Sequence, residues 1–294
     1  KPSTNHVLLN HYYAVIDTAH KSRKRYKDMS NVTEPATPVP AATILLLRPS
    51  DKNLEVFMVV RHHQIDFASG ALVFPGGKAD SQDFDDALIP LISTPNPDPD
   101  MRGAEVSALR EAFEECGILL AYTQGTQSMI DGEKLESIQH YREPLNSGEI
   151  LLKDFLEKEN LVLACDQLTR FAHWITPEMM PKRFDTHFYL ALAPQDHVAV
   201  HDGYESVDSV WIDPTQAVAE ANAGKRTIIF PTRLNLEKLA TWETPQEAIQ
   251  AAQETDIVSV LPWTEKRDDG NYLCIPVEAG YSVSEEKMPE RGIK

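Results

Sequence analysis

Three glutamates, Glu111, Glu114 and Glu115, stand at positions i, i+3 and i+4 of one short stretch. On a helix that turns about 100° per residue, they lie within roughly 100° of arc. Like charges this close repel one another, so the arrangement costs stability unless a cation lies among them. Oxygen ligands suit a hard divalent ion such as Mg²⁺ or Mn²⁺. A solvated acidic face is the commoner role of such a charge run, so the neighbouring sequence must decide.

The residues around the glutamates predict a helix with a buried side. Four apolar positions share the spacing of one helix face: Leu109, Ala112, Phe113 and Cys116. Gly117 follows them, and glycine ends a helix readily because it adopts the left-handed conformation at little cost. The carboxylates are therefore expected on a rigid element that packs against a core.

A glycine motif, Val-Phe-Pro-Gly-Gly-Lys at residues 73–78, lies upstream of this helix. Together with residues 110–118 it resembles the Nudix box, G-x5-E-x7-R-E-U-x-E-E-x-G-U, in which U is a bulky aliphatic residue. The second half of the box matches at Arg110, Glu111, Glu114, Glu115, Gly117 and Ile118. Ala112, at the first U, is smaller than the pattern specifies.

The first half of the box departs from the pattern. Counting forward from Gly77 places the isolated glutamate of the motif on Asp83, a shorter carboxylate. Counting back from Arg110 places it on Arg102, so the chain carries an insertion of 102 − 83 = 19 residues. Residues 90–99 hold four prolines and predict an irregular loop. Either Asp83 replaces the missing glutamate, or that glutamate is absent.

The resemblance implies a reaction and a site. Nudix enzymes hydrolyse a nucleoside diphosphate linked to another group X, and metal ions neutralise the phosphate oxygens while water attacks one phosphorus. By motif position, Glu111 and Glu115 are expected to bind Mg²⁺ or Mn²⁺, and Glu114 to share a second ion or hold a water. The carbonyl of Gly76 is the expected backbone ligand, at a turn where glycine allows close approach. Arg110 is expected to orient a glutamate through its planar guanidinium.

The general base is left open among three acidic residues. Glu111 or Glu114 could accept the proton, because a metal lowers the pKa of water and the base then needs only modest strength. Glu205 lies six residues before Trp211, in a loop where the relatives often place another acidic residue. An exposed loop carboxylate is the alternative for Glu205.

The nature of X is addressed by a longer motif upstream of the glycines. Nudix proteins that cleave coenzyme A often carry L-L-T-x-R-[S/A]-x3-R-x3-G-x3-F-P-G-G, and here Arg61, Gly70 and Phe-Pro-Gly-Gly fall on its spacing. His62 stands at the [S/A] position and Asp66 at the second arginine, which removes a cation that would bind phosphate. A coenzyme A thioester is therefore weighed against nucleotide sugars, dinucleotides and ADP-ribose. The candidate substrate-binding residues are Arg61 and Lys78.

A second class of function is kept beside hydrolysis. Some Nudix-like domains bind nucleotides as sensors after losing a catalytic residue, and the discrepancy between Asp83 and Arg102 is what such a loss would look like. Because the acidic and basic residues most needed for metal are all present in residues 110–115, an enzyme is preferred.

Composition and charge fit a small-molecule enzyme. The chain has 294 residues, 42% hydrophobic and 25% charged, which is typical of a globular protein with one enlarged domain or one domain with extensions. Its 28 basic and 45 acidic residues give a net charge of −17. An acidic surface repels a phosphate backbone, so a nucleic-acid partner is not expected. The expected partner is a small-molecule diphosphate, and a homodimer is left open.

Cysteine use and hydropathy favour a cytoplasmic protein. Three isolated cysteines, Cys116, Cys165 and Cys274, form neither a zinc spacing nor a disulfide framework. No run of 18 apolar residues predicts a membrane-spanning helix, and the first residues lack the apolar core of a signal peptide.

The rest of the chain predicts strands interrupted by a few helices. Strands are expected at residues 41–48, 54–61, 71–74, 168–175, 183–192 and 209–213, and helices within 131–160 and at 214–223, 232–242 and after the capping box at 244–247. Without regular βαβ alternation this is an α+β protein. The resemblance specifies an α/β/α sandwich with a mixed sheet, enlarged by an insertion at about 80–100 and by terminal extensions. We expect an arm at 1–40, the Nudix domain at 41–245 and a packed C-terminal extension at 246–294.

Overall fold

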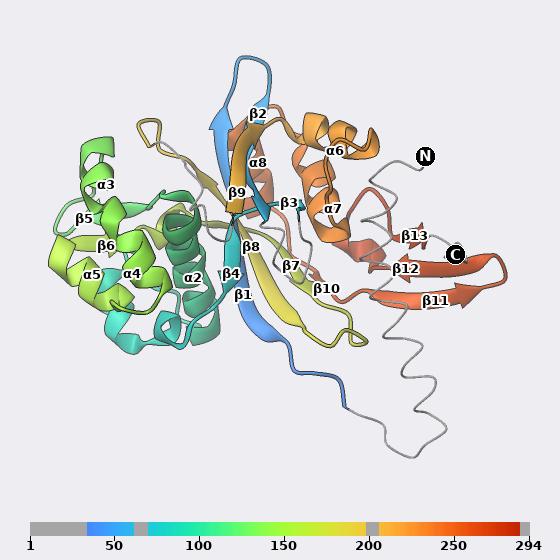
Figure 1. The fold of residues 1–294 in the computed structure, drawn as a ribbon, viewed down its shortest axis with the longest axis horizontal. Helices are drawn as coiled ribbons and strands as arrows, with labels where there is room; N and C mark the ends of the chain where they lie inside the picture. Colours follow the sequence, from blue (N-terminus) through green and yellow to red (C-terminus); the bar gives the residue numbers. More distant parts are fainter. Residues whose placement is uncertain (1–33, 62–69, 198–205, 289–294) are drawn as a thin grey trace.

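A mixed β-sheet forms the centre of the molecule (Figure 1). The computed structural model describes residues 34–61, 70–197 and 206–288. Within them the sheet has eight strands: β1 (Val39–Pro49), β2 (Leu54–Arg61), β3 (Leu72–Val73), β4 (Gly76–Lys78), β7 (Thr169–Ile175), β8 (Phe184–Leu192), β9 (Ser206–Ile212) and β10 (Ser259–Val260). The order is β10-β7-β8-β1-β2-β3, while β4 also pairs with β1 and β9 with β2. β1 runs parallel to β8 and β7 parallel to β10, and the other pairs are antiparallel.

Strand β1 holds the two layers of the core apart. Its side chains alternate, so Ala42, Ile44 and Leu46 join the apolar cluster on one face, while Leu45 and Leu47 join the cluster on the other. All five are buried. A strand covered on both faces carries a continuous apolar run rather than an alternating one, which explains the sequence of this strand.

One face of the sheet is covered by the helices that follow the glycine motif (Figure 1). They are α2 (Pro99–Cys116), α3 (Gly132–Ile138), α4 (Arg142–Asn146) and α5 (Leu152–Glu159), with the 3₁₀ helices η1 (Ser81–Phe84), η2 (Asp86–Leu91), η3 (Gln139–Tyr141) and η4 (Cys165–Gln167). A two-stranded ribbon, β5 (Ala121–Thr123) with β6 (Leu161–Leu163), lies in the same layer. This layer contains the carboxylate helix.

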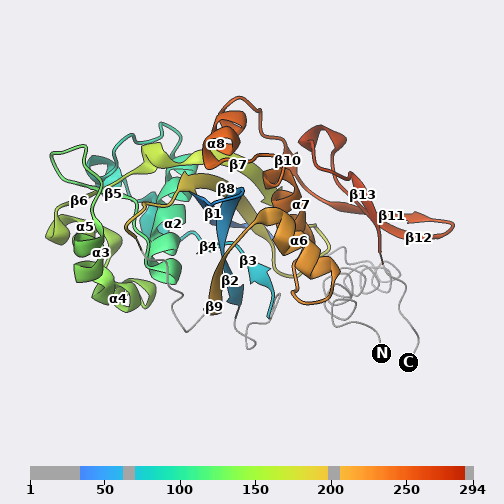
Figure 2. The same ribbon diagram turned by 90° about the horizontal axis from the view of Figure 1, so that it is seen from above.

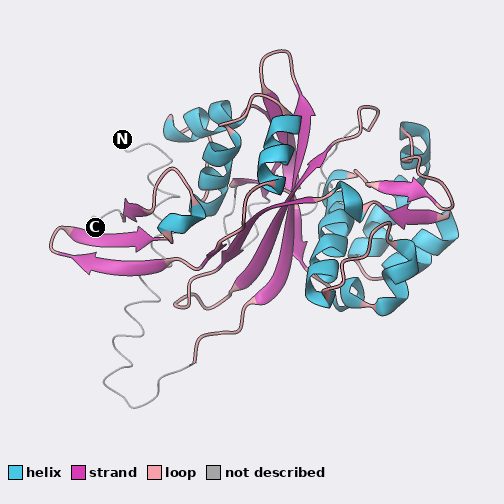
Figure 3. Ribbon diagram, turned by 180° about the vertical axis from the view of Figure 1, so that it is seen from behind, coloured by secondary structure: helices cyan, strands magenta, loops and turns pink. Residues whose placement is uncertain are grey.

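The other face is covered by C-terminal helices, as the views from above and behind show (Figures 2 and 3). These are α6 (Pro214–Asn222), α7 (Phe230–Leu239) and α8 (Pro245–Gln253). A small sheet of β11 (Trp263–Arg267), β12 (Gly270–Cys274) and β13 (Glu285–Lys287) extends beyond them, with η5 (Val277–Ala279) between its last two strands. The expected α/β/α sandwich with a mixed sheet is therefore confirmed.

Most local predictions are confirmed, and the differences have physical causes. The capping box of Thr244 with Glu247 opens α8, and Gly117 ends α2 with φ 68°. The irregular loop predicted at 90–99 is confirmed for residues 92–98, between η2 and α2. The earlier part of the insertion is instead ordered, because aspartate N-caps start η1 and η2. Residues 131–160 are helical but broken into short segments. The β5–β6 ribbon was not predicted, because each strand has only three residues.

Two further expectations concern the limits of the domain and the membrane. α8 and β10, which lie at or beyond the predicted domain boundary at residue 245, both contact β7 of the central sheet. The boundary itself stays a prediction. In the described ranges, every helix is too short or too polar to cross a lipid bilayer.

Candidate active site

Helix α2 positions the acidic residues from a buried place in the fold. Asp98 caps its first turn by accepting the backbone N–H of Asp100, and Pro99 occupies the first turn, where its missing N–H costs nothing. The sequence predicted one buried side, but 13 of the 18 residues are buried, so the helix is covered over more of its surface than predicted. Glu114 and Glu115 are 5% and 7% exposed. The acidic face is thus not a solvated surface.

The glycine turn lies directly against this helix. A Cβ on Gly77 would stand 2.6 Å from the Glu111 carboxylate, so only glycine leaves room for that carboxylate. A Cβ on Gly76, whose φ is 150°, would stand 2.3 Å from the carbonyl oxygen of Ala42 on β1. The Gly76 N–H donates to Glu115 Oε2 at 2.8 Å. The Pro-Gly-Gly turn and the glutamates therefore form one site, as the sequence predicts.

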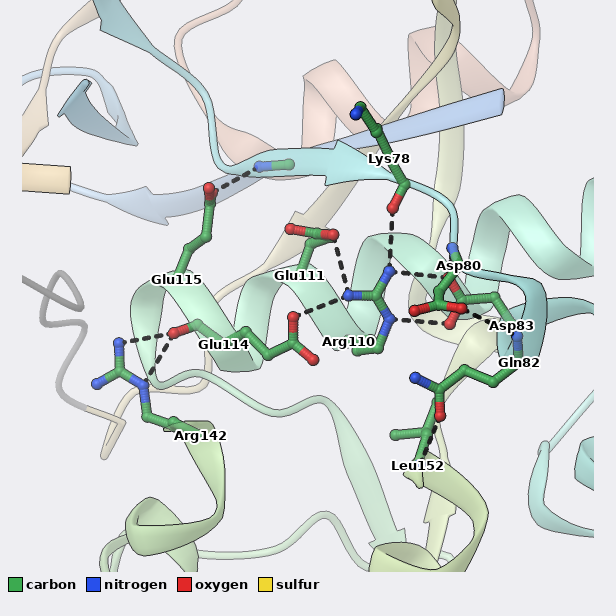
Figure 4. A network of polar contacts seen from close by, with 11 residues as sticks. Lys78, Asp80, Gln82, Asp83, Arg110, Glu111, Glu114, Glu115, Arg142 and Leu152 are labelled. Carbon is green, nitrogen blue, oxygen red and sulfur yellow. Dashed lines mark hydrogen bonds and ion pairs between the residues drawn. The ribbon is translucent and has the colours of Figure 1, made fainter. Parts of the chain in front are cut away.

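The Arg110 guanidinium is the centre of the polar network (Figure 4). It donates two hydrogen bonds to Asp83, from Nε to Oδ1 and from Nη2 to Oδ2, both 2.9 Å. Its Nη1 donates to Glu111 Oε1 at 2.9 Å and to Glu114 Oε2 at 2.8 Å. Nη2 also donates to the backbone carbonyl of Lys78 at 3.1 Å. The role expected of Arg110, holding glutamates in place, matches these contacts.

The structure shows different surroundings for Asp83 and Arg102, the two residues that counting places at the isolated acidic position of the box. Asp83 is 1% exposed, faces Arg110, and also accepts the backbone N–H of Asp80 at 2.8 Å. Arg102 points to another part of the insertion, where it pairs with Asp86 at 2.6 Å. Asp83 is therefore the candidate that contacts Arg110, and its role as the isolated carboxylate of the box stays a prediction.

Burial and charge set the protonation of this cluster. Burial lowers the pKa of Arg110, but the hydrogen bonds to Asp83 and the charges of Glu111, Asp83 and Glu114 outweigh it and raise that pKa. Burial raises the pKa of Glu114 to about 8. The positive charge of Arg110 lowers this pKa, but the negative charges of Glu111 and Asp83 oppose that effect. Glu114 Oε1 is buried without a hydrogen-bond partner in the described residues. An oxygen in that state is costly unless a ligand contacts it.

The donor set fits a hard divalent ion. Glu111, Glu114 and Glu115 supply carboxylate oxygens within two helical turns, and the unpartnered Glu114 oxygen offers a ligand position. Nudix hydrolases in general use Mg²⁺ or Mn²⁺. In the structure the Gly76 N–H donates a hydrogen bond to Glu115. The role of the Gly76 carbonyl as a metal ligand stays a prediction.

Two residues of the site were missed from the sequence. Arg142 donates from Nε and Nη2 to the backbone carbonyl of Glu114, at 3.1 and 3.0 Å. Gln139 Nε2 donates to the carbonyl of Gly117 at 2.8 Å. Together they bind the C-terminal carbonyls of α2, where a cation is favoured by the helix dipole. Because Arg142 is 28 residues from Glu114, no local pattern could reveal the contact.

The structure describes only some of the other residues that the sequence assigned to the site. The Lys78 side chain is exposed, and the network uses its backbone carbonyl. The backbone of Arg61 ends β2, while its side chain is outside the described part of the chain. Glu205, His62 and Asp66 also lie outside the described residues.

Comparisons with known proteins agree with this geometry. The family model described as the NUDT19 Nudix domain matches residues 94–239. Nudix hydrolase 7 of Caenorhabditis elegans is 28% identical over 204 residues, which cover 68% of this chain and 60% of that protein. Acyl-coenzyme A diphosphatase NUDT19 of Xenopus laevis is 23% identical over 226 residues, covering 63% of this chain and 59% of that protein. The chain thus spans less than two thirds of either relative.

A solved structure agrees in fold as well as sequence. The Nudix hydrolase of Alicyclobacillus acidocaldarius superposes with a TM-score of 0.60 and 25% identity, covering 73% of this chain and 96% of that one. The chain belongs to the Nudix hydrolase superfamily and resembles its acyl-coenzyme A diphosphatases.

Proposed function

We propose that this protein hydrolyses the P–O–P bond of a nucleoside diphosphate linked to another group, with Mg²⁺ or Mn²⁺ as cofactor. The observation that carries the proposal is the state of Glu114. One of its carboxylate oxygens contacts Arg110, and the other is buried without a partner in the described structure. Glu111 and Asp83 contact the same guanidinium, so negative charge exceeds the positive charge that faces it. A divalent ion would satisfy both the oxygen and the charge.

The residues have separate tasks in this proposal. Glu111, Glu114 and Glu115 hold the metal, which when bound neutralises phosphate oxygens and makes a nearby water more acidic. Arg110 keeps two of these glutamates in position, because its planar fork is itself fixed by Asp83. Glu111 and Glu114 are the described candidates for accepting the proton of the attacking water. Glu205 remains a third candidate from the sequence.

We further propose a coenzyme A or acyl-coenzyme A species as substrate. The curated relative from Xenopus laevis is named an acyl-coenzyme A diphosphatase. Arg61 and the Phe-Pro-Gly-Gly turn also fit the spacing of the coenzyme A motif, while His62 and Asp66 depart from it. Because His62 and Asp66 depart from the motif, nucleotide sugars, dinucleotides and ADP-ribose remain alternative substrates.

A substrate panel tests both levels of the proposal. The protein is incubated with coenzyme A, acetyl- and long-chain acyl-coenzyme A, ADP-ribose, a dinucleotide and a nucleotide sugar, each with Mg²⁺ or Mn²⁺ in ¹⁸O-labelled water. Mass spectrometry is expected to show adenosine 3′,5′-bisphosphate and a phosphopantetheine fragment, with the label on one of them. Faster cleavage of another compound would replace the substrate class. Ligand-induced melting shifts without any product would identify a nucleotide-binding sensor and overturn the proposed hydrolysis.

The arginine at the end of β2 gives a sharper test of substrate class. Arg61→Ala is expected to raise KM for coenzyme A by about tenfold, as loss of one phosphate contact does, and to leave KM for ADP-ribose within about twofold. The matched control is Arg48→Ala, because Arg48 is the penultimate residue of β1 and pairs with Glu55 across the hairpin. An equal rise in both KM values would show that Arg61 does not select coenzyme A.

A further inference from the structure

Two histidines and an aspartate meet on the sheet at a place that the proposed hydrolysis does not use. His173 on β7 and Asp185 and His187 on β8 each offer a ligand atom, and these atoms lie within 4.8 Å of one another. All three residues are half-buried. This histidine cluster combines the donor types that bind transition metals, namely neutral imidazole and carboxylate.

The strand register brings these residues to one face. Asp185 and His187 are two apart on β8, so their side chains point to the same side. His187 pairs directly with His173 on β7, and their rings stack with centroids 4.1 Å apart and planes 8° from parallel. Tyr189, the next residue of this face, packs in the core under α2. The cluster therefore lies on the α2 side of the sheet.

The polar atoms of the cluster are unequally satisfied. His173 Nε2 bonds Asp185 Oδ1, and His173 Nδ1 lies 2.7 Å from Ser259 Oγ on β10. His187 Nδ1 is buried without a hydrogen-bond partner in the part of the chain that is described. A buried ring nitrogen in this state is costly, and a metal ion is one ligand that would satisfy it.

The histidine cluster is separate from the carboxylates of α2. Gly77 on β4 pairs with Ala42 on β1, and Ala42 pairs with His187 on β8, so β1 lies between the glycine turn and the histidine cluster. Two strand spacings amount to about 10 Å, whereas the ions of a two-metal catalytic site lie about 4 Å apart. The donors differ too, because the α2 site offers only oxygen atoms.

We propose that His173, Asp185 and His187 bind a transition-metal dication of the zinc class. In this proposal His173 binds through Nε2, so Nδ1 carries the proton and donates it to Ser259 Oγ, 2.7 Å away, which holds the ring in place. Three protein ligands leave a fourth position for water or a ligand atom. Asp98, at the start of α2, adds a favourable negative charge near His187, and Arg170 an opposing positive one. The inference does not depend on the proposed hydrolysis.

Zinc titration tests the site directly. Chelator-stripped protein is titrated with Zn²⁺ against a chromophoric indicator, in excess Mg²⁺ to saturate the α2 carboxylates. We expect one tight equivalent per chain, weakened at least about 100-fold by His187→Ala or His173→Ala and about tenfold by Ser259→Ala. The control is His140→Ala, an exposed histidine of η3, which is expected to bind zinc normally.

The α2 site and the fold need their own controls. A double variant, Glu111→Gln with Glu115→Gln, is expected to keep the zinc equivalent, and its loss would assign the zinc to the carboxylates and overturn the inference. Absence of a tight equivalent in the wild type would overturn it as well. If the histidine variants fail to fold, nuclear magnetic resonance of the wild type decides: Zn²⁺ must shift the ring signals of His173 and His187 before those of His140.

Discussion

Asp83 and Arg110 face each other through two parallel hydrogen bonds, both 2.9 Å long and almost fully removed from solvent. The pair joins the insertion to the carboxylate helix, because Asp83 also belongs to the capping box of η1. Arg110 in turn contacts Glu111 and Glu114. A residue of the insertion therefore holds the arginine that positions the acidic residues.

Asp83→Asn is expected to destabilise the protein by about 3–5 kcal/mol, because it leaves the buried Arg110 charge without its bidentate partner. Urea unfolding measures the loss. The matched control is Asp154→Asn, an exposed aspartate in the first turn of α5, which should change stability by less than about 0.5 kcal/mol. Equal stability of the two variants would show that the pair does not hold the insertion in place.

Glu115→Gln is expected to abolish metal-dependent turnover without unfolding the protein. The amide oxygen of glutamine can still accept the Gly76 N–H, but it brings no negative charge to a metal. Steady-state kinetics at saturating Mg²⁺ gives kcat. Glu105→Gln is the control on the same helix, because Glu105 contacts Asn96 outside the Arg110 network. More than about a tenth of wild-type kcat in Glu115→Gln would contradict the assignment.

Alanine substitutions at the two glycines of the turn are expected to have different effects, mainly on kcat at Gly77 and mainly on stability at Gly76. Gly77→Ala places a Cβ against the flexible end of Glu111, which can move, so we expect about 100-fold lower kcat with a stability cost below about 1.5 kcal/mol. Gly76→Ala places a Cβ against the β1 backbone at a φ of 150°, with a cost on the order of 3 kcal/mol. Thermal melting and kinetics of the two variants, side by side, separate these effects. A Gly77→Ala enzyme with normal kcat would show that Glu111 tolerates displacement.

The parts of the site that follow from local spacing were predictable from the sequence. Glu111, Glu114 and Glu115 lie together because helical periodicity places them there, and Gly117 ends the helix because of its backbone freedom. The Pro-Gly-Gly turn was assigned to the same site through the resemblance. Local chemistry and a specific motif sufficed for these.

The parts that depend on distant contacts were not predictable. Counting along the chain could not choose between Asp83 and Arg102, because the insertion changes the register and only three-dimensional packing shows which residue meets Arg110. Arg142 caps α2 from a separate helix. The pairing of His173 with His187 depends on the β7–β8 register, which is interrupted by a bulge near Arg170. No single-sequence pattern encodes such a register.

Glu114 is expected to make the stability of the metal-free protein fall as pH rises. Burial raises its pKa from 4.5 to about 8, so the folded state holds this proton where the unfolded state has lost it. The contribution is fully present below pH 4.5 and is lost as the pH passes through about 8. Melting temperatures in chelator between pH 5 and 9 should therefore decline less steeply in Glu114→Gln than in wild type, and the variant should be the more stable at pH 9. Glu133→Gln, at an exposed position of α3, should follow the wild-type curve. Parallel curves for wild type and Glu114→Gln would mean that Glu114 is already ionised at neutral pH and that Arg110 alone compensates its charge.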